Sequence, residues 1–355
     1  MVKHAKTSRT HVFEGKIREY EKQIVDYFRE ISGMRNQSVI IATTIAYFLN
    51  HGRLTQRQLR ELTGYSMGTV SSSLISLVNF GLLKKQIIPG THEFEYVLPS
   101  SLVQIVNLYR INVLNEINQA RKFFQALLSE VDRNTLLYSR IIDILAFLEV
   151  NEELISLFNL RTTVETEISE KKPSVSTGRQ ISGIEAAMTA GTLEAEKKVF
   201  DYFMGPLQAS LFLDQKITVT KIIACFVTRE TLTQKQLRVV SGLSAGAVSQ
   251  GLQHLLHLGM ITKVTTSGPS HHAYQMKSVK KALLTYLELP TRRSTELEST
   301  FTKIRDEMDT NYSVLSSSRG YKEVYGMVTQ YLRIFPVSRK MLKVIDREML
   351  SNEGS

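Results

Sequence analysis

Apolar residues recur at helical spacing in two stretches of the chain that align without a gap. In the first stretch, Val70, Leu74, Leu77 and Val78 occupy positions i, i+4, i+7 and i+8, which predicts a helix with one buried face. The same spacing returns at Val248, Leu252, Leu255 and Leu256. The alignment pairs the stretch from Ile45 to Lys85 with the stretch from Ile223 to Lys263 at one constant offset. The sequence therefore contains an internal repeat.

Turn and capping residues divide each repeat into the same elements. Thr55 and Gln58 have the spacing of a capping box at a helix start, and Thr233 and Gln236 repeat it. A glycine then provides a turn before the second helix, and a further glycine ends that helix; these residues are Gly64 and Gly242, then Gly81 and Gly259. Two short helices joined in this way predict helix-turn-helix motifs at 54–80 and 232–258. Each is followed by two β-rich runs around a turn, which predicts wings at 82–98 and 260–276.

Weaker similarity outside these motifs indicates that a longer unit is repeated. The stretch EKQIVDYF from Glu21 resembles EKKVFDYF from Glu196, and the helical pattern near Ile141 resembles that near Val324. We therefore expect a first unit at 1–172 with C-terminal helices at 101–158, a linker at 173–190, and a second unit at 191–355 with C-terminal helices at 279–350. The expected fold class is mainly α with small β-wings: two tandem winged helix-turn-helix domains whose long flanking helices form a pseudo-dimer. The alternative is that the flanking helices pack only on their own domain.

The repeated motif resembles a known family of regulators. The pattern runs from Ser66-x-Gly68-x-Val70-Ser71 through Gly81-Leu82-Leu83-Lys84-Lys85, and its copy runs from Ser244 to Lys263. Over about forty residues per copy it is similar to the GbsR branch of the MarR-like winged-helix regulators. The resemblance implies a dimeric repressor or activator with a homodimer interface in its terminal helices and a small-molecule effector of unknown identity. This chain departs from the family because it is a tandem and because its reading helices lack arginine.

The net charge indicates which class of partner to expect, and the apolar runs indicate where the protein is located. The formal net charge is +10 with a pI near 9.5, and division after residue 178 gives +3 and +7. This balance favours a polyanionic partner, with a basic solubilising surface as the alternative. No apolar run reaches the roughly 18 residues of a membrane span, and the N-terminus lacks the apolar core of a secretory signal. We expect a cytoplasmic, nucleoid-associated protein without a membrane partner. The single cysteine, Cys225, lies in an apolar run and is interpreted as a small buried residue.

The predicted DNA-binding residues form two groups. The base-reading faces of the second helices carry Met67, Thr69, Ser72, Ser73 and Ser76 in the first copy, and Ala245, Ala247, Gln250, Gln253 and His254 in the second. The predicted phosphate and wing contacts are Arg53, Arg57, Arg60, Lys84, Lys85, His92, Lys235, Arg238, Lys263, His271 and His272. The histidine pairs lack further ligands at metal-binding spacing, and no catalytic or phosphate-loop motif is present. We therefore expect no enzyme, no metal site and no cofactor.

These patterns predict a transcriptional regulator that binds double-stranded DNA. Two recognition helices in one chain would read two half-sites about 34 Å apart. Because the two reading faces differ, the operator would be an imperfect palindrome. The alternatives are a protein–protein interaction scaffold and an architectural DNA-binding protein with little sequence specificity.

Overall fold

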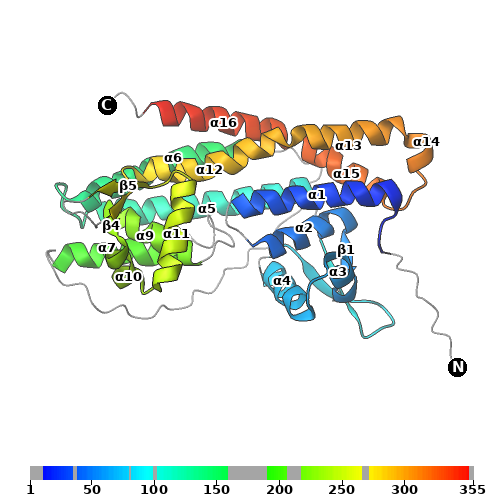
Figure 1. The fold of residues 1–355 in the computed structure, drawn as a ribbon, viewed down its shortest axis with the longest axis horizontal. Helices are drawn as coiled ribbons and strands as arrows, with labels where there is room; N and C mark the ends of the chain where they lie inside the picture. The colour runs from blue at the N-terminus through cyan, green and yellow to red at the C-terminus, as the bar shows by residue number, and fades with distance from the viewer. Residues whose placement is uncertain are drawn as a thin grey trace. The chain divides into compact units, whose positions relative to one another are not determined.

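The chain folds into two compact units, each assembled from separated stretches of sequence. The computed structural model describes residues 11–34, 38–79, 81–98, 102–158, 190–205, 217–265 and 272–351. In these residues the chain is mainly helical, with two small antiparallel sheets (Figure 1). Unit 1 contains Met1–Met34, Ser38–Val106 and Arg293–Val337; unit 2 contains Arg35–Gln37, Asn107–Arg292 and Ser338–Ser355.

Residues 39–97 of unit 1 form what we call the N-terminal winged segment. Its elements are, in order, α2 (Val39–His51), β1 (Arg53–Thr55), α3 (Gln56–Thr63), α4 (Met67–Asn79), β2 (Lys84–Ile87) and β3 (Phe94–Val97). Strand β3 lies between β1 and β2 and pairs antiparallel with both. This order and topology are compatible with a winged helix-turn-helix.

Residues 217–275 of unit 2 form the central winged segment, which has the same construction. Its elements are α9 (Ile217–Thr228), β4 (Thr231–Thr233), α10 (Gln234–Ser241), α11 (Ala245–His257), β5 (Thr262–Thr265) and β6 (His272–Gln275). From β4 to β6, every element begins and ends at the residues that the sequence alignment pairs with the bounds of its counterpart. The sheet order β4-β6-β5 also matches β1-β3-β2. The structure thus follows the sequence alignment element by element.

The predicted capping boxes and turns are confirmed in both segments. The Thr55 hydroxyl accepts a hydrogen bond from the Gln58 backbone N–H at 3.2 Å, and the Gln58 side chain accepts one from the Thr55 N–H at 2.8 Å. Thr233 and Gln236 form the same two bonds at 3.2 and 2.8 Å. Gly64 and Gly242 end these helices with φ of 72° and 67°, a left-handed backbone that glycine adopts without a Cβ clash.

The cores of the two segments use equivalent residues. Equivalent fully buried residues include Leu59, Val70, Leu74 and Leu77 in one segment, and Leu237, Val248, Leu252 and Leu255 in the other. The sequence did not predict the short strands β1 and β4, because three residues are too few to show an alternating pattern. Each is held by one buried leucine, Leu54 or Leu232, and by pairing with the second wing strand.

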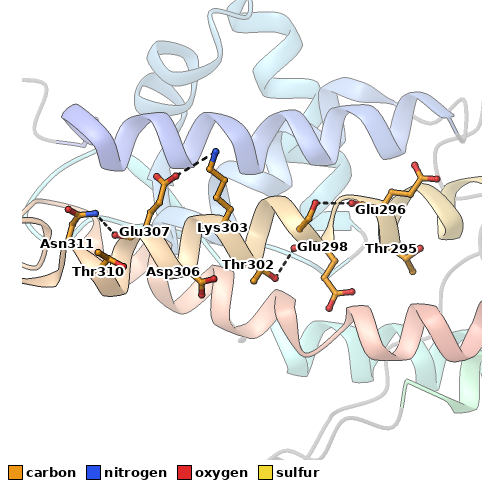
Figure 2. Close-up of a pocket in the computed structure, with 10 residues that line it drawn as sticks. Thr295, Glu296, Glu298, Thr302, Lys303, Asp306, Glu307, Thr310 and Asn311 are labelled. Carbon is orange, nitrogen blue, oxygen red and sulfur yellow. Dashed lines mark hydrogen bonds and ion pairs between the residues drawn. The ribbon is translucent and has the colours of Figure 1, made fainter.

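Unit 1 is completed by a long N-terminal helix and by helices from the end of the chain. These are α1 (Gly15–Met34), α13 (Glu298–Thr310), α14 (Tyr312–Leu315) and α15 (Tyr321–Leu332). Both α1 and α15 pack on α2, and α13 packs on α15. An aromatic cluster of Tyr27, Phe301, Tyr331 and Phe335 joins these helices. The polar side of α13 is shown in Figure 2.

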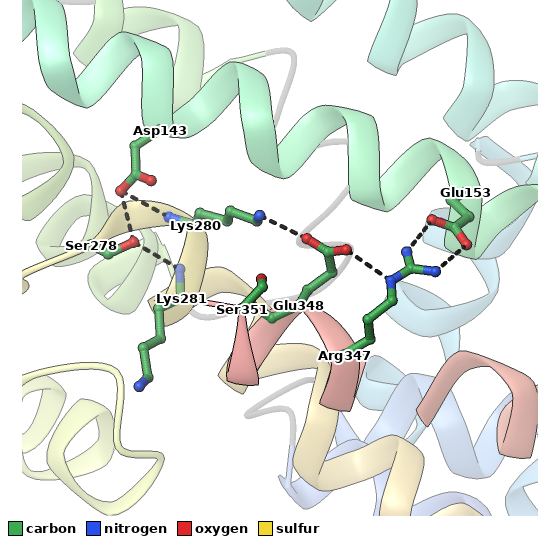
Figure 3. Close-up of polar contacts among 8 residues, drawn as sticks. All are labelled: Asp143, Glu153, Ser278, Lys280, Lys281, Arg347, Glu348 and Ser351. Carbon is green, nitrogen blue, oxygen red and sulfur yellow. Dashed lines mark hydrogen bonds and ion pairs between the residues drawn. The ribbon is translucent and has the colours of Figure 1, made fainter. Parts of the chain in front are cut away.

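In the described part of the chain, unit 2 contains five helices besides the central winged segment. These are α5 (Leu102–Leu128), α6 (Leu136–Ser156), α7 (Ala190–Met204), α12 (Val279–Glu296) and α16 (Phe335–Leu350); the ends of α5, α12 and α16 extend beyond the residues assigned to this unit. Both α7 and α6 pack on α9. Figure 3 shows α12 and α16 joined by the Lys280 ammonium and the Glu348 carboxylate, which are 2.8 Å apart.

Two charged residues of α6 hold the ends of neighbouring helices. Arg140, only 3% exposed, donates hydrogen bonds to the carbonyls of Phe226 and Val227 at the end of α9, at 2.7 and 3.1 Å, and to that of Lys277 at 3.0 Å. Asp143, one turn later, accepts hydrogen bonds from the Ser278 hydroxyl and the first N–H groups of α12 (Figure 3). A cation at a helix C-terminus and an anion at an N-terminus are both favourable placements. Desolvation lowers the pKa of Arg140, an effect that Asp143 and Glu230 oppose.

The compact units differ from the division expected from the sequence. Helix α6, from the first half of the chain, packs on the central winged segment, and α15, from the last part, packs on the N-terminal winged segment. Each unit therefore combines residues from both sides of the linker expected at 173–190, of which 173–189 lie outside the described residues. Helices α6 and α15 thus each contact a winged segment from the other side of that expected linker.

Candidate nucleic-acid interface

The second helix of each motif begins at an exposed serine. The Ser66 hydroxyl accepts a hydrogen bond from the Thr69 N–H at 3.2 Å at the start of α4, and the Ser244 hydroxyl accepts one from the Ala247 N–H at 3.3 Å at the start of α11. The free N–H groups of a helix N-terminus attract anions such as DNA phosphates. Both recognition-helix candidates therefore present their N-terminal ends to solvent.

Four of the five predicted reading residues of α4 reach the surface. Met67 and Ser72 are exposed, whereas Thr69 and Ser76 are half-buried. The prediction for Ser73 is wrong: this residue is 2% exposed and its hydroxyl donates to the Val70 carbonyl at 2.8 Å. Position 73 lies three residues after Val70 and shares the buried side of the helix, so its hydroxyl cannot reach a base edge.

The reading residues of α11 have a similar distribution. Ala245, Gln250 and Gln253 are exposed, whereas Ala247 and His254 are half-buried. Gly251 stands where Ser73 stands in α4, and a Cβ on Gly251 would lie 2.3 Å from the Ile222 Cδ1. The buried side of α11 therefore packs more closely on α9 than a serine at this position would allow.

The basic residues around α4 are exposed, but several already have partners. Arg53, Arg57, Arg60, Lys84, Lys85 and His92 all lie at the surface. The Arg57 Nε is 3.3 Å from a Glu61 carboxylate oxygen, and Arg53 is 3.8 Å from Glu95. The Lys85 Nζ lies 4.0 Å from the centre of the Phe94 ring. This segment offers phosphate contacts whose charge is partly neutralised within the segment.

The basic residues around α11 are exposed without such neutralisation. Lys235, Arg238, Lys263 and His272 lie at the surface, whereas His271 falls outside the described residues. In the part of the chain that the structure describes, no carboxylate lies within ion-pair distance of Lys235, Arg238 or Lys263. The two candidate interfaces thus share a scaffold and differ in charge.

The sequence predictions missed the apolar and acidic residues on the N-terminal winged segment. Ile75, Ile87 and Phe94 are 56%, 60% and 44% exposed. The Glu61 contact could have been predicted, because Glu61 follows Arg57 by four residues on a helix. The exposure of Ile87 and Phe94 could not, because it depends on the pairing of β2 with β3.

Each winged segment is attached to the preceding long helix by a buried glutamate. Glu21 of α1 accepts from Arg18 and lies 2.5 Å from the His51 Nε2 at the end of α2. Glu196 of α7 lies 2.8 Å from the Arg229 guanidinium, at the position equivalent to His51. These glutamates begin the two stretches that resemble each other outside the motifs, so that similarity corresponds to equivalent contacts.

Cys225 is buried in α9, as the sequence predicted. Burial raises the pKa of its thiol to about 12. Tyr47 occupies the equivalent position in α2, where burial also raises its pKa and its hydroxyl donates to the Leu62 carbonyl at 3.0 Å. Neither residue contributes to the exposed interface.

A depression on unit 1 is a possible site besides these interfaces. A shallow depression beside α13 is lined by polar residues (Figure 2), but Thr302 and Asn311 there donate to carbonyls of their own helix, those of Glu298 and Glu307. Among the described residues, no group of three or more His, Cys, Asp or Glu side chains could hold a metal ion. None of the described helices combines the length and apolar character needed to cross a membrane.

Comparison with known proteins adds little to this picture. No protein-family model matches the chain, and no curated protein matches it. A solved structure described as the crystal structure of a transcriptional regulator aligns with 44% of this chain and 98% of its own, at 13% identity and a TM-score of 0.30. A likeness at that level carries no functional conclusion.

Proposed function

We propose that this protein is a DNA-binding transcriptional regulator that contacts duplex DNA through both winged segments. The observation that carries the proposal is the repetition, at one constant offset, of a helix-turn-helix with an exposed second helix, a β-wing and flanking basic residues. In a helix-turn-helix, the N-terminal end of the second helix enters the major groove. Lysine and arginine at its edges neutralise phosphates.

The proposal includes a pseudo-dimeric arrangement within one chain. Its support is the exchange of helices: each winged segment packs on a helix from the other half of the chain, α15 on α2 and α6 on α9. Such an exchange is expected if two repeats associate through their long helices as two subunits would. Under this proposal one chain covers two half-sites of an imperfect palindrome, in place of the two chains that the resemblance to dimeric GbsR-type MarR-like regulators implies. A homodimer through the terminal helices and an unidentified small-molecule effector are further elements that the resemblance implies.

The test is binding of the full chain to genomic DNA fragments and to random duplex of equal length, at about 50 and about 200 mM salt. Phosphate contacts weaken steeply over this range, whereas base contacts preserve a preference between fragments. We expect preferred fragments that remain preferred at the higher salt. Binding without preference would indicate an architectural protein, and absence of binding to any duplex would refute the proposal.

A protein-interaction scaffold is the second candidate, favoured by the surface of α4. Met67 and Ile75 are 47% and 56% exposed there, and no arginine lies on the exposed face of this helix. An Arg–guanine pair contributes about 1–3 kcal/mol of base discrimination, which this helix lacks. Substitution of Lys84, Lys85 and Lys263 by alanine discriminates the two functions, because it weakens DNA binding and leaves binding to a protein partner through α4 intact.

A further inference from the structure

The two winged segments carry different residues at equivalent surface positions. Glu61, Ile75 and Phe94 of the N-terminal winged segment correspond to Val239, Gln253 and His272 of the central winged segment, and the half-buried Glu95 corresponds to the buried Ala273. Of these, Ile75 and Phe94 are exposed apolar residues, whereas Gln253 and His272 are exposed polar ones. Three changes distinguish the motif and wing of the central segment: the carboxylate of Glu61 gives way to the exposed Val239, and the exposed apolar Ile75 and Phe94 give way to polar residues.

The difference in acidic residues is complete over the motif and wing. The sequence from 231 to 276 contains no Asp or Glu, whereas 53–98 contains Glu61, Glu93 and Glu95. The central stretch also has four histidines, His254, His257, His271 and His272, against one in the N-terminal stretch, His92. The three fixed cations of this stretch, Lys235, Arg238 and Lys263, therefore act on an approaching phosphate without a carboxylate between residues 231 and 276 to oppose them.

The contacts within the N-terminal winged segment reduce its attraction for DNA. An exposed ion pair such as Arg57–Glu61 stabilises the fold little, yet the carboxylate still repels a phosphate brought near the arginine. Lys85 is held over the Phe94 ring and would have to leave it to reach a phosphate. This cation–π contact is attractive and so opposes the movement of Lys85 toward a phosphate.

From this contrast we infer that the central winged segment supplies most of the phosphate contacts to duplex DNA, and that the N-terminal winged segment contributes a minor share. This inference rests on the proposed DNA-binding function and assigns it unequally to the two segments. The residues that carry the larger share are Lys235, Arg238 and Lys263. The salt dependence of DNA binding then arises chiefly from the central winged segment.

Matched double variants at equivalent positions test the inference. Lys235→Ala/Lys263→Ala and Arg57→Ala/Lys85→Ala each remove two exposed cations from the same places on the two segments. Each lost phosphate contact lowers the slope of log K against log salt by about 0.9. We expect the central pair to lower the slope by about 2 and the affinity at least about 10-fold at moderate salt, and the N-terminal pair to lower the slope by less than about 1.

A reciprocal exchange at one position provides a second measurement that does not remove any cation. Val239→Glu introduces into α10 the carboxylate that Glu61 provides in α3, four residues after Lys235, and Val239 is 55% exposed so that the helix should tolerate it. We expect Val239→Glu to weaken binding about 10-fold and Glu61→Val to change it by less than about 3-fold, on the basis of one added or removed phosphate-facing charge. Circular dichroism confirms that the variants fold.

The outcomes separate this inference from the proposed function. If the wild-type chain binds DNA and the two double variants have equal effects, or the N-terminal pair has the larger one, the inference is overturned and the proposed function stands. If the wild-type chain binds no duplex at either salt concentration, both are overturned. If binding falls mainly in the central variants and with Val239→Glu, the unequal assignment is established.

Discussion

The N-terminal and central winged segments have the same backbone plan and different surfaces. Their helices and strands coincide when the two repeats are aligned, and their cores place leucine or valine at the same buried positions. At the surface, Glu61 corresponds to Val239 and Phe94 to His272. The comparison shows that packing and capping fix the residues inside such a segment, whereas exposed positions are free to differ.

The largest expected effect tests whether the cores of the two winged segments contribute equally to the free energy of unfolding. Leu59→Ala and Leu237→Ala each remove a fully buried side chain at equivalent positions. Loss of burial and the remaining cavity should lower the free energy of unfolding by about 3 kcal/mol in each variant. Chemical denaturation followed by circular dichroism measures both. Because equivalent cavities should cost similar amounts, a difference of more than about 2 kcal/mol between the variants would contradict the equivalence of the cores.

An effect of similar size should test how the central winged segment is attached to α6. Arg140→Met leaves three backbone carbonyls without their buried donor, which should lower the unfolding free energy by about 3 kcal/mol. Ile142→Ala, on the same helix and 45% exposed, is the control and should cost less than about 1 kcal/mol. Equal stability of the two variants in thermal denaturation would show that Arg140 does not hold α9.

Alkaline pH should lower the stability of the central winged segment through ionisation of Cys225. Its thiol has a pKa raised to about 12 in the folded chain, against about 8.5 in an unfolded one. Folding favours the neutral thiol, so the thiol's contribution to the free energy of unfolding is complete below about pH 8.5. As the pH rises from there toward the pKa of the folded chain, this contribution falls by about 1.4 kcal/mol per pH unit. Denaturation at pH 7.5 and 9.5 should show a larger loss in the wild type than in Cys225→Ala. Identical pH dependence would indicate that the thiol is accessible to solvent.

The smallest expected effect concerns the capping boxes, which the two segments share. Thr55→Ala and Thr233→Ala each remove a hydroxyl that accepts an N–H at 3.2 Å. Each should lower the unfolding free energy by about 1 kcal/mol. Thr55→Ser and Thr233→Ser keep the acceptor and should restore most of it. Failure of serine to do so would mean that the threonine methyl, and not the cap, stabilises the helix start.

The sequence alone determined the local elements of both segments because their causes lie within a few residues. A capping box spans four residues, a left-handed glycine acts at one, and the apolar spacing of α4 and α11 repeats within two or three turns. It also identified most exposed cations, since lysine and arginine outside an apolar stripe remain in solvent. It misplaced Ser73 because a small polar residue can occupy either side of a helix, and only packing against α2 decides which.

Only the tertiary structure decided which helices belong together. Arg140 of α6 reaches carbonyls that are 86, 87 and 137 residues away, and Tyr20 of α1 donates to Glu307, 287 residues away. Apolar periodicity predicts that such helices bury one face, but it contains no information on the partner that covers that face. The partner is selected by shape, charge and hydrogen bonding between distant segments, and so each winged segment came to pack on a helix from the other half of the chain.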